Sequence, residues 1–267
     1  MGHRLLLVGC GKMGGALLDG WLRAGIVDHV DVVEPSVATL PRDPRVVRHD
    51  AADAVADAPR PEIVVIAVKP QVTDTVVPAY RRFVAPGTAF VSIAAGRTLG
   101  YFGDLLGAEA AVVRAMPNTP AAIGQGISVM VANDHVDDAQ RHLAGRLMAA
   151  AGAVEWVEDE GLIDAVTALS GGGPAYVFLL IETLAQAGAA AGLPTALAMR
   201  LARQTVVGSG ALAAASEEAA ATLRRNVTSP GGTTQAALEV LMAADGVQPL
   251  FDRAIAAATK RSRELAG

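Results

Sequence analysis

The sequence has few of the side chains that usually act as strong catalytic groups. It contains one cysteine, three lysines and five histidines among 267 residues. The single Cys10 excludes an internal disulfide and a zinc site made of several thiolates. Beyond residue 150 there is no histidine, and Lys260 is the only lysine. No H-E-x-x-H, P-loop or G-x-S-x-G pattern occurs, so the common metalloprotease, NTPase and serine-hydrolase chemistries are excluded.

Charge is also scarce. Charged residues make up 18% of the chain, the net charge is −5, and no basic run occurs, which argues against nucleic acid or an anionic membrane as partner. Hydrophobic residues make up 52%, so the chain can bury a large core. The opening MGHRLLLVGCG has too short an apolar run for a secretory signal. We therefore expect a cytoplasmic protein.

One stretch, AYVFLLIETLAQAGAAAGL at 175–193, is apolar around almost its whole circumference. It carries Glu182 and Gln186 in its middle and lacks basic flanks, which disfavours a membrane span. We expect a helix buried on all sides, either within a domain or against a partner subunit.

The first half alternates between short apolar runs and helical patterns. Strands are expected at 4–9, 29–34, 62–69, 88–94, 111–116, 126–133 and 153–158, and helices at 13–25, 71–84, 99–107 and from about 134. Pro78 should end or kink the second helix. Asp137 and Asp138 fit the N-terminus of the last helix better than a metal site. This alternation predicts a parallel sheet covered on both faces.

The second half lacks a convincing strand. Helical patterns rich in alanine and leucine follow one another, separated by SGGGP, GLP and SPGG. We predict an α/β chain with two domains. An N-terminal Rossmann-type dinucleotide-binding domain spans 1–158, and an all-α dimerisation and substrate domain spans 159–267.

The loop GCGKMGG at 9–15 contains G-x-G-x-x-G between the first strand and the first helix, where a dinucleotide pyrophosphate binds. Glu34 follows at the end of the second strand, where an acid bonds a ribose 2′-hydroxyl. In that position it would repel a 2′-phosphate and favour NADH. A solvated strand-end acid is the alternative for Glu34.

Four motifs then follow in order behind this loop: AVKP at 67–70, MPNTP at 116–120, SGGGPAYVF at 170–178 and SPGGTT at 229–234. Together they make the chain resemble pyrroline-5-carboxylate reductase over essentially its whole length. The resemblance implies reduction of 1-pyrroline-5-carboxylate to L-proline, the last step of proline biosynthesis, with NADPH or NADH. It also implies homodimers formed through the helical domain, often assembled into decamers. The family commonly prefers NADPH and has a small or polar residue after the second strand, where this chain has Glu34.

The resemblance also implies the site residues. Backbone N–H groups of Gly232, Thr233 and Thr234, in the turn begun by Gly231, would bind the substrate carboxylate, and the Thr234 hydroxyl would face the ring nitrogen as the catalytic side chain. The implied cofactor-binding residues are Gly9, Cys10, Gly11, Lys12, Met13, Gly14, Glu34, Ser36, Ala67, Val68, Lys69 and Pro70, with Asn118 near the nicotinamide. No metal is expected. A plain helix cap is the alternative for SPGGTT, and a solvated charge is the alternative for Lys69.

The expected chemistry agrees with the scarcity of acids and bases. A pyrroline imine can enter already protonated, so less general acid catalysis is needed than the ~10²–10⁴-fold it usually provides. What remains is alignment of the reacting atoms within about 3–3.5 Å.

Two other functions fit parts of the pattern. A β-hydroxyacid dehydrogenase shares the architecture but uses a lysine on a helix of its second domain, and the only lysine past Lys69 is Lys260, close to the C-terminus. A dinucleotide-sensing protein without turnover would show no substrate-dependent oxidation of NAD(P)H.

Overall fold

The computed structural model describes residues 2–36 and 40–266. These form two compact units, Met1–Gly171 with Ala258–Gly267, and Gly172–Ala257. The expected boundary between two functional domains at residue 158 stays a prediction.

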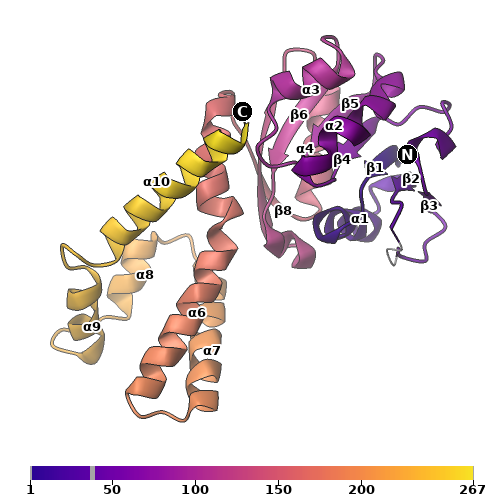
Figure 1. Cartoon of the computed structure of the whole chain (residues 1–267). Coiled ribbons are helices and arrows are strands. Elements are labelled where there is room, and N and C mark those ends of the chain that lie inside the picture. The colour runs from indigo at the N-terminus through magenta and orange to yellow at the C-terminus, as the bar shows by residue number, and fades with distance from the viewer. Residues whose placement is uncertain (1, 37–39, 267) are drawn as a thin grey trace. The chain divides into compact units, whose positions relative to one another are not determined.

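The first unit is an eight-stranded sheet with helices on both faces (Figure 1). The strands are β1 (His3–Val8), β2 (Val27–Val33), β3 (Val46–His49), β4 (Ile63–Ile66), β5 (Ala89–Ser92), β6 (Ala111–Met116), β7 (Gly126–Ala132) and β8 (Gly152–Trp156). The α-helices of the first 171 residues are α1 (Lys12–Ala24), α2 (Thr73–Val76), α3 (Leu99–Leu106), α4 (Asp138–Ala149) and α5 (Ile163–Val166). The 3₁₀ segments are Ala52–Ala54, Pro70–Val72, Val77–Phe83, Thr119–Ile123 and Glu160–Leu162, and Thr167–Gly171 is a π-helical turn.

The strand order is β3-β2-β1-β4-β5-β6-β7-β8. Neighbouring strands are parallel, except that β7 runs antiparallel to β6. The expected parallel sheet is confirmed, and the β6–β7 pair is a local departure from it. The 3₁₀ turn Thr119–Ile123 and Gly124, at φ +70°, reverse the chain between the two strands without a crossover helix.

Alternation along β1 divides the core into two layers. Leu5 and Leu7 pack with Trp21 of α1 on one face, while Leu6 and Val8 pack with Phe102 of α3 on the other. All six side chains are at most 1% exposed. Both faces of the strand are apolar because helices cover both, as the continuous run RLLLV predicts.

Several local expectations are confirmed. Pro78 lies where the single α-helical turn α2 gives way to the 3₁₀ segment Val77–Phe83. Asp137 caps α4, accepting from the Gln140 amide at 2.8 Å, while the Gln140 side chain accepts from the Asp137 amide at 2.9 Å. This capping box accounts for Asp137 without a metal.

The second half is helical throughout its described residues, as expected. Its helices are α6 (Gly173–Ala190), α7 (Thr195–Ala214), α8 (Ala220–Asn226), α9 (Thr233–Leu241) and α10 (Val247–Ala266). Helices α6 and α7 meet along small side chains, with Ala185, Ala198 and Ala202 buried. A Cβ on Gly188 would come within 3.3 Å of the Ala198 Cβ, which explains why this crossing needs small residues.

The apolar helix α6 is exposed over most of its surface in the single chain. Phe178, Leu179 and Leu180 are 48–59% exposed. By length and composition alone, one stretch among the described residues, Glu160–Ala190, could cross a membrane, and 11% of its most apolar window is buried. Helix α6 is therefore not buried within its own domain, and burial against a partner subunit is the alternative that remains.

An acidic side chain is buried on β2, the strand next to the edge of the sheet. Asp31 of β2 is 6% exposed and pairs with Arg4 at 2.8 Å, His49 at 2.8 Å and His29 at 3.1 Å. Burial by itself raises the pKa of Asp31, but hydrogen bonds from His49 and His29 and the charge of Arg4 outweigh it and leave the pKa below the usual 3.8. This carboxylate joins β1, β2 and β3.

Replacing this carboxylate should weaken the fold in a pH-dependent way. We expect Asp31→Asn to lower the free energy of unfolding at pH 7 by about 1–3 kcal/mol, because Arg4 loses its buried partner. The native pKa is depressed, so the stabilisation is present above pH 3.8 and is lost as pH falls below it. Denaturant titrations at several pH values should show the two proteins converging in acid. The exposed Asp104→Asn is the control, and a pH-independent difference would contradict the assignment.

Candidate active site

The glycine turn between β1 and α1 is packed too tightly to accept side chains at two positions. Gly9 has φ +88°, and a Cβ there would come 2.9 Å from Val68 Cγ1 and 3.0 Å from the Ala67 carbonyl oxygen. A Cβ on Gly14 would overlap the Gly9 carbonyl oxygen. The turn thus lies directly against the segment that follows β4. Helix α1 begins behind Gly11 with no side-chain cap, so its first amides are available to an anion.

Glu34 ties the end of β2 to this turn. Its carboxylate accepts hydrogen bonds from the Cys10 amide at 2.8 Å, from the Ser36 amide at 3.0 Å and from the Ser36 hydroxyl. Burial by itself raises the pKa of Glu34, but the bonds from Ser36 and Cys10 and the nearby charge of Arg48 outweigh it and hold the pKa below its usual range. Glu34 is therefore an anion at neutral pH.

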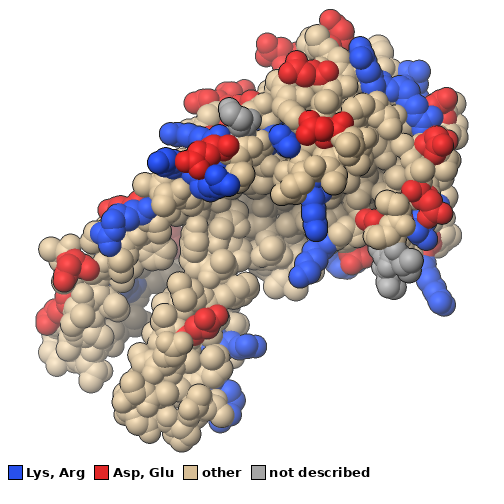
Figure 2. All heavy atoms as spheres, viewed as in Figure 1, with Lys and Arg blue, Asp and Glu red and all other residues tan. Residues whose placement is uncertain are grey.

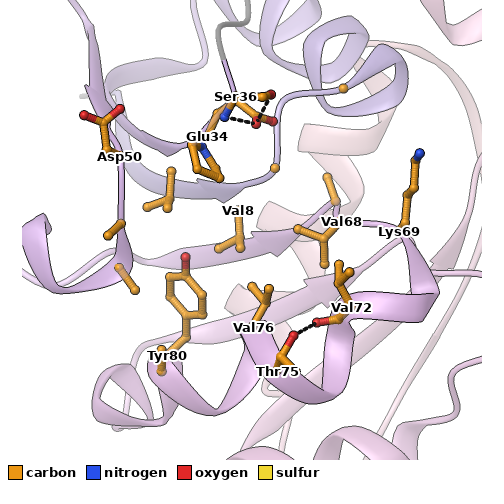
Figure 3. Close-up of a pocket in the computed structure, with 18 residues that line it drawn as sticks. Val8, Glu34, Ser36, Asp50, Val68, Lys69, Val72, Thr75, Val76 and Tyr80 are labelled. Carbon is orange, nitrogen blue, oxygen red and sulfur yellow. Dashed lines mark hydrogen bonds between the residues drawn. The ribbon is translucent and has the colours of Figure 1, made fainter.

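A cavity of about 660 Å³ opens beside Glu34 at the carboxyl ends of β1, β2 and β4 (Figure 3). Seven of the predicted cofactor-binding residues line it: Gly9, Gly11, Glu34, Ser36, Ala67, Val68 and Lys69. Ligands of open α/β sheets bind at this edge of the strands. In Figure 3 the Glu34 side chain lies at the upper rim and Lys69 at the far end from Asp50.

Five other predicted cofactor-binding residues lie close in sequence to residues that line the cavity but do not line it themselves. Cys10 belongs to the glycine turn, Lys12 and Met13 form the first turn of α1 with Gly14, and Pro70 begins the 3₁₀ segment after Lys69. Burial, followed by the charges of Glu34 and Asp19, raises the pKa of Cys10 to about 11, so this thiol stays protonated at neutral pH.

The Asn118 side chain makes two hydrogen bonds to the backbone. Its side-chain amide donates to the Ser170 carbonyl at 3.2 Å, and its Oδ1 accepts from the Ile127 amide at 2.9 Å. The side chain thus joins β7 to the π-helical turn Thr167–Gly171. A contact of Asn118 with the nicotinamide stays a prediction.

The sequence prediction missed one wall of the cavity. Val72, Thr75, Val76, Ala79 and Tyr80 line it from the segment after AVKP, as the side chains below Val8 and Val68 in Figure 3 show. Their spacing of three to four residues was the available signal, since it places one face of a helical turn toward the strands. Burial raises the pKa of Tyr80 to about 12, so its phenol is neutral at physiological pH.

The cavity also has a third side, from the residues after β3. Asp50, Ala51 and Ala52 line it there, and Asp50 pairs with Arg48 at 2.7 Å. Arg48 also donates to the Glu34 carbonyl at 3.2 Å and to the Ser36 carbonyl at 3.4 Å. A positive charge therefore lies beside Glu34, the residue expected to contact the ribose, and beside Ser36.

SPGGTT forms the start of α9 in the helical unit. Gly231 has φ +68°, and its amide donates to the Gln235 side chain at 2.7 Å. The Gly232 amide donates to the Ser229 carbonyl at 3.0 Å. Of the three amides expected to bind a carboxylate, those of Thr233 and Thr234 have no acceptor among the described residues. Both threonines are exposed.

No cluster of three or more histidine, cysteine or carboxylate side chains that could hold a metal occurs among the described residues. The residues present do fit a dinucleotide. The glycine turn leaves room for a pyrophosphate at the start of α1, and one carboxylate stands at the ribose position beside a cavity of sufficient size.

Comparisons with known proteins agree with this arrangement. The family described as pyrroline-5-carboxylate reductase dimerisation matches residues 160–265, and the one described as NADP oxidoreductase coenzyme F420-dependent matches 4–96. The curated pyrroline-5-carboxylate reductase of Pseudomonas aeruginosa is 41% identical over 268 residues, covering 98% of this chain and 97% of that protein. That of Mycobacterium tuberculosis is 39% identical over 289 residues, covering 98% and 96%.

Solved structures give the same result. A pyrroline-5-carboxylate reductase from Coxiella burnetii has a TM-score of 0.90 at 32% identity and covers 100% of both chains. The Plasmodium falciparum enzyme, solved with NADP bound, has a TM-score of 0.83 at 28% identity, covering 99% of this chain and 98% of that one. With a dinucleotide-type cavity in the first unit and a helical dimerisation domain following it in the sequence, this chain belongs to the pyrroline-5-carboxylate reductase family, the NAD(P)H-dependent oxidoreductases of proline biosynthesis.

Proposed function

We propose that this reductase holds its cofactor in the cavity beside Glu34, holds the substrate carboxylate at the start of α9, and uses NADH as well as NADPH. The observation that carries the cofactor assignment is the Glu34 carboxylate, ionised and lining the cavity at the end of β2. Steady-state oxidation of NADPH and NADH with 1-pyrroline-5-carboxylate, followed at 340 nm, tests the proposal.

The argument for NADH rests on the bonding capacity of Glu34. A carboxylate has about four lone-pair sites, and three donors from Cys10 and Ser36 occupy three of them. One site remains for a ribose hydroxyl. The same negative charge opposes a 2′-phosphate, whereas Arg48 beside Glu34 and Ser36 favours one. Glu34 and Arg48 thus have opposite effects on the binding of a 2′-phosphate, so we expect comparable use of both cofactors.

The chain's own residues supply position more than proton transfer. NAD(P)H, when bound, supplies the hydride. Gly9, Gly11 and the first amides of α1 would hold its pyrophosphate, and the segment from Ala67 to Lys69 would form the opposite side. The amides of Thr233 and Thr234 would hold the substrate carboxylate, helped by the positive end of α9. The Thr234 hydroxyl would orient the ring nitrogen, since it is too weak an acid to protonate it near pH 7.

Assembly follows from the exposed apolar surface of the helical unit. On the face drawn in Figure 2, charged side chains gather over the α/β unit, and the region of α6 and α7 is largely uncharged. A contiguous apolar surface of this kind drives association. We propose a cytoplasmic homodimer formed through this unit, with α6 at or near the interface. Further association of these dimers would give a decamer.

Exchanging Glu34 tests the cofactor assignment. We expect Glu34→Ser to lower the KM for NADPH about threefold to tenfold, because the repulsive charge is removed, and to leave NADH unchanged or weaker. Parallel steady-state kinetics with both cofactors measure this. A wild-type preference for NADPH above about tenfold, together with no effect of the exchange, would show that Glu34 does not face the ribose.

A charge on α6 tests the assembly. We expect Leu180→Asp to give insoluble or dissociated protein, because the interface would bury an unpaired charge. Light scattering at micromolar protein gives the mass and separates monomer, dimer and decamer. Ala108→Asp, which adds the same charge to an exposed turn of the α/β unit, should leave the mass unchanged. A monodisperse, active wild-type monomer would refute the proposal.

The two neighbouring threonines of SPGGTT provide a matched pair for the substrate site. We expect Thr234→Ala to lower kcat/KM by roughly 10–1000-fold, the loss of one or two well-placed hydrogen bonds. Thr233→Ala keeps the backbone amide proposed to act there and should stay within about threefold of wild type. NAD(P)H binding, followed by fluorescence, should be unchanged in both. Full activity in Thr234→Ala would reduce the loop to a helix cap.

A further inference from the structure

One backbone carbonyl beside the cofactor cavity receives an unusual number of donors. The Pro70 carbonyl oxygen accepts from the Thr73 hydroxyl at 2.8 Å, from Arg97 Nη2 at 3.0 Å and from Arg97 Nε at 3.3 Å. Two of these donors belong to one guanidinium. Hydrogen bonds from a charged donor are roughly twice as strong as those between neutral groups. Arg97 is therefore the main side-chain restraint on this carbonyl.

Arg97 is itself held in place from a neighbouring helix. Its guanidinium carbon lies 4.6 Å from the centre of the Tyr101 ring, and its Nη2 lies 3.6 Å from the Asp74 carboxylate. The Tyr101 hydroxyl donates to Asp74 at 2.7 Å and lies 2.6 Å from the Thr73 hydroxyl. These contacts join the start of α3 to the start of α2. Arg97 side-chain exposure is 23%, so water competes only in part.

The restrained carbonyl belongs to the segment that forms the cavity. Ala67, Val68 and Lys69 line the cavity just before Pro70, and Val72 lines it just after. The Val72 amide donates to the Lys69 carbonyl at 3.1 Å, so the chain turns sharply at this point. Arg97 stands outside the residues that line the cavity, and its contact with this segment is through the Pro70 backbone.

We propose that Arg97 is a positioning residue for the cofactor: by fixing the Pro70 carbonyl, it sets the turn from Ala67 to Val72 that forms one side of the cavity. The inference rests on the proposed use of this cavity for NAD(P)H. Without the guanidinium, the Pro70 carbonyl keeps only neutral hydrogen bonds, from the Thr73 hydroxyl and the Thr73 amide, and the turn gains freedom that the cofactor must remove on binding. The cost then appears in cofactor affinity and leaves the rate of the bound enzyme unaffected.

The test compares two arginines with similar surroundings. Arg141 also lies over an aromatic ring, 4.2 Å from the Trp156 centre, and pairs with Glu158 at 2.9 Å, but on α4, away from the cavity lining. We expect Arg97→Met to raise the Kd for NADPH and for NADH by the same factor, about tenfold, with kcat at saturating cofactor within threefold. Arg141→Met should leave both Kd values unchanged.

Two further measurements separate positioning from a general loss of stability. Arg97→Lys can still donate one charged hydrogen bond to Pro70, so its Kd should lie within about threefold of wild type. Hydrogen exchange, read by mass spectrometry, should be faster in peptides covering residues 67–76 of Arg97→Met, and unchanged there in Arg141→Met. Should Arg97→Met not fold, Tyr101→Phe, which removes only the hydroxyl, is expected to raise Kd about twofold to threefold with the same local change in exchange.

An unchanged Kd in folded Arg97→Met, an equal rise in Arg141→Met, or a loss confined to kcat would each overturn the proposal. Binding is measured without turnover, so the outcome is independent of the reaction. Normal binding with no reduction of 1-pyrroline-5-carboxylate would contradict the proposed function and leave the role of Arg97 intact.

Discussion

The close approach of the glycine turn to the segment after β4 is the constraint on which the site depends. Gly9 and Gly14 have no room for a Cβ because the Val68 side chain, the Ala67 carbonyl and the turn's own carbonyl occupy that space. This contact brings the start of α1 and the ends of β1 and β4 together on one edge of the sheet. The Cys10 amide within this turn also holds Glu34, so the charge that faces the cavity is fixed by the same turn. The first amides of α1 and the Glu34 carboxylate thus cannot be altered independently.

The far side of the cavity depends on different interactions. There the chain passes from β4 into a 3₁₀ turn and a single turn of α-helix, which are too short to be rigid by themselves. Side chains supply the rigidity, since Thr73 and Arg97 hold the Pro70 carbonyl and Tyr80 is buried beneath the cavity. One side of the cavity is therefore set by backbone packing and the other by polar side chains. Such a division allows the second side to adapt more readily to a ligand.

The sequence predicted the elements whose patterns reflect burial by the chain itself. The runs of β1 and β4 are apolar on both faces, and the G-x-G-x-x-G turn lies between a strand and a helix, so both were identified. Strand β3 was missed because Val46–His49 is a short edge strand with only half-buried and exposed side chains and therefore has no hydrophobic run. The cavity wall at Val76 and Tyr80 was missed because the helical spacing over 71–84 predicts a face turned toward the strands but does not show that this face lines a cavity. The direction of β7 depends on a 3₁₀ turn that the pattern does not specify.

Helix α6 shows the limit of such predictions most clearly. Its composition predicts that it is covered, but composition does not say by what, and Leu180 is 48% exposed in the single chain. The seam between α6 and α7 uses alanine and glycine, which bury little apolar area, while the larger side chains of α6 face outward. Such an interior stabilises an isolated unit only weakly, because the hydrophobic free energy scales with the apolar area removed from water. Association through this unit would supply the missing burial, in agreement with its match to a dimerisation family.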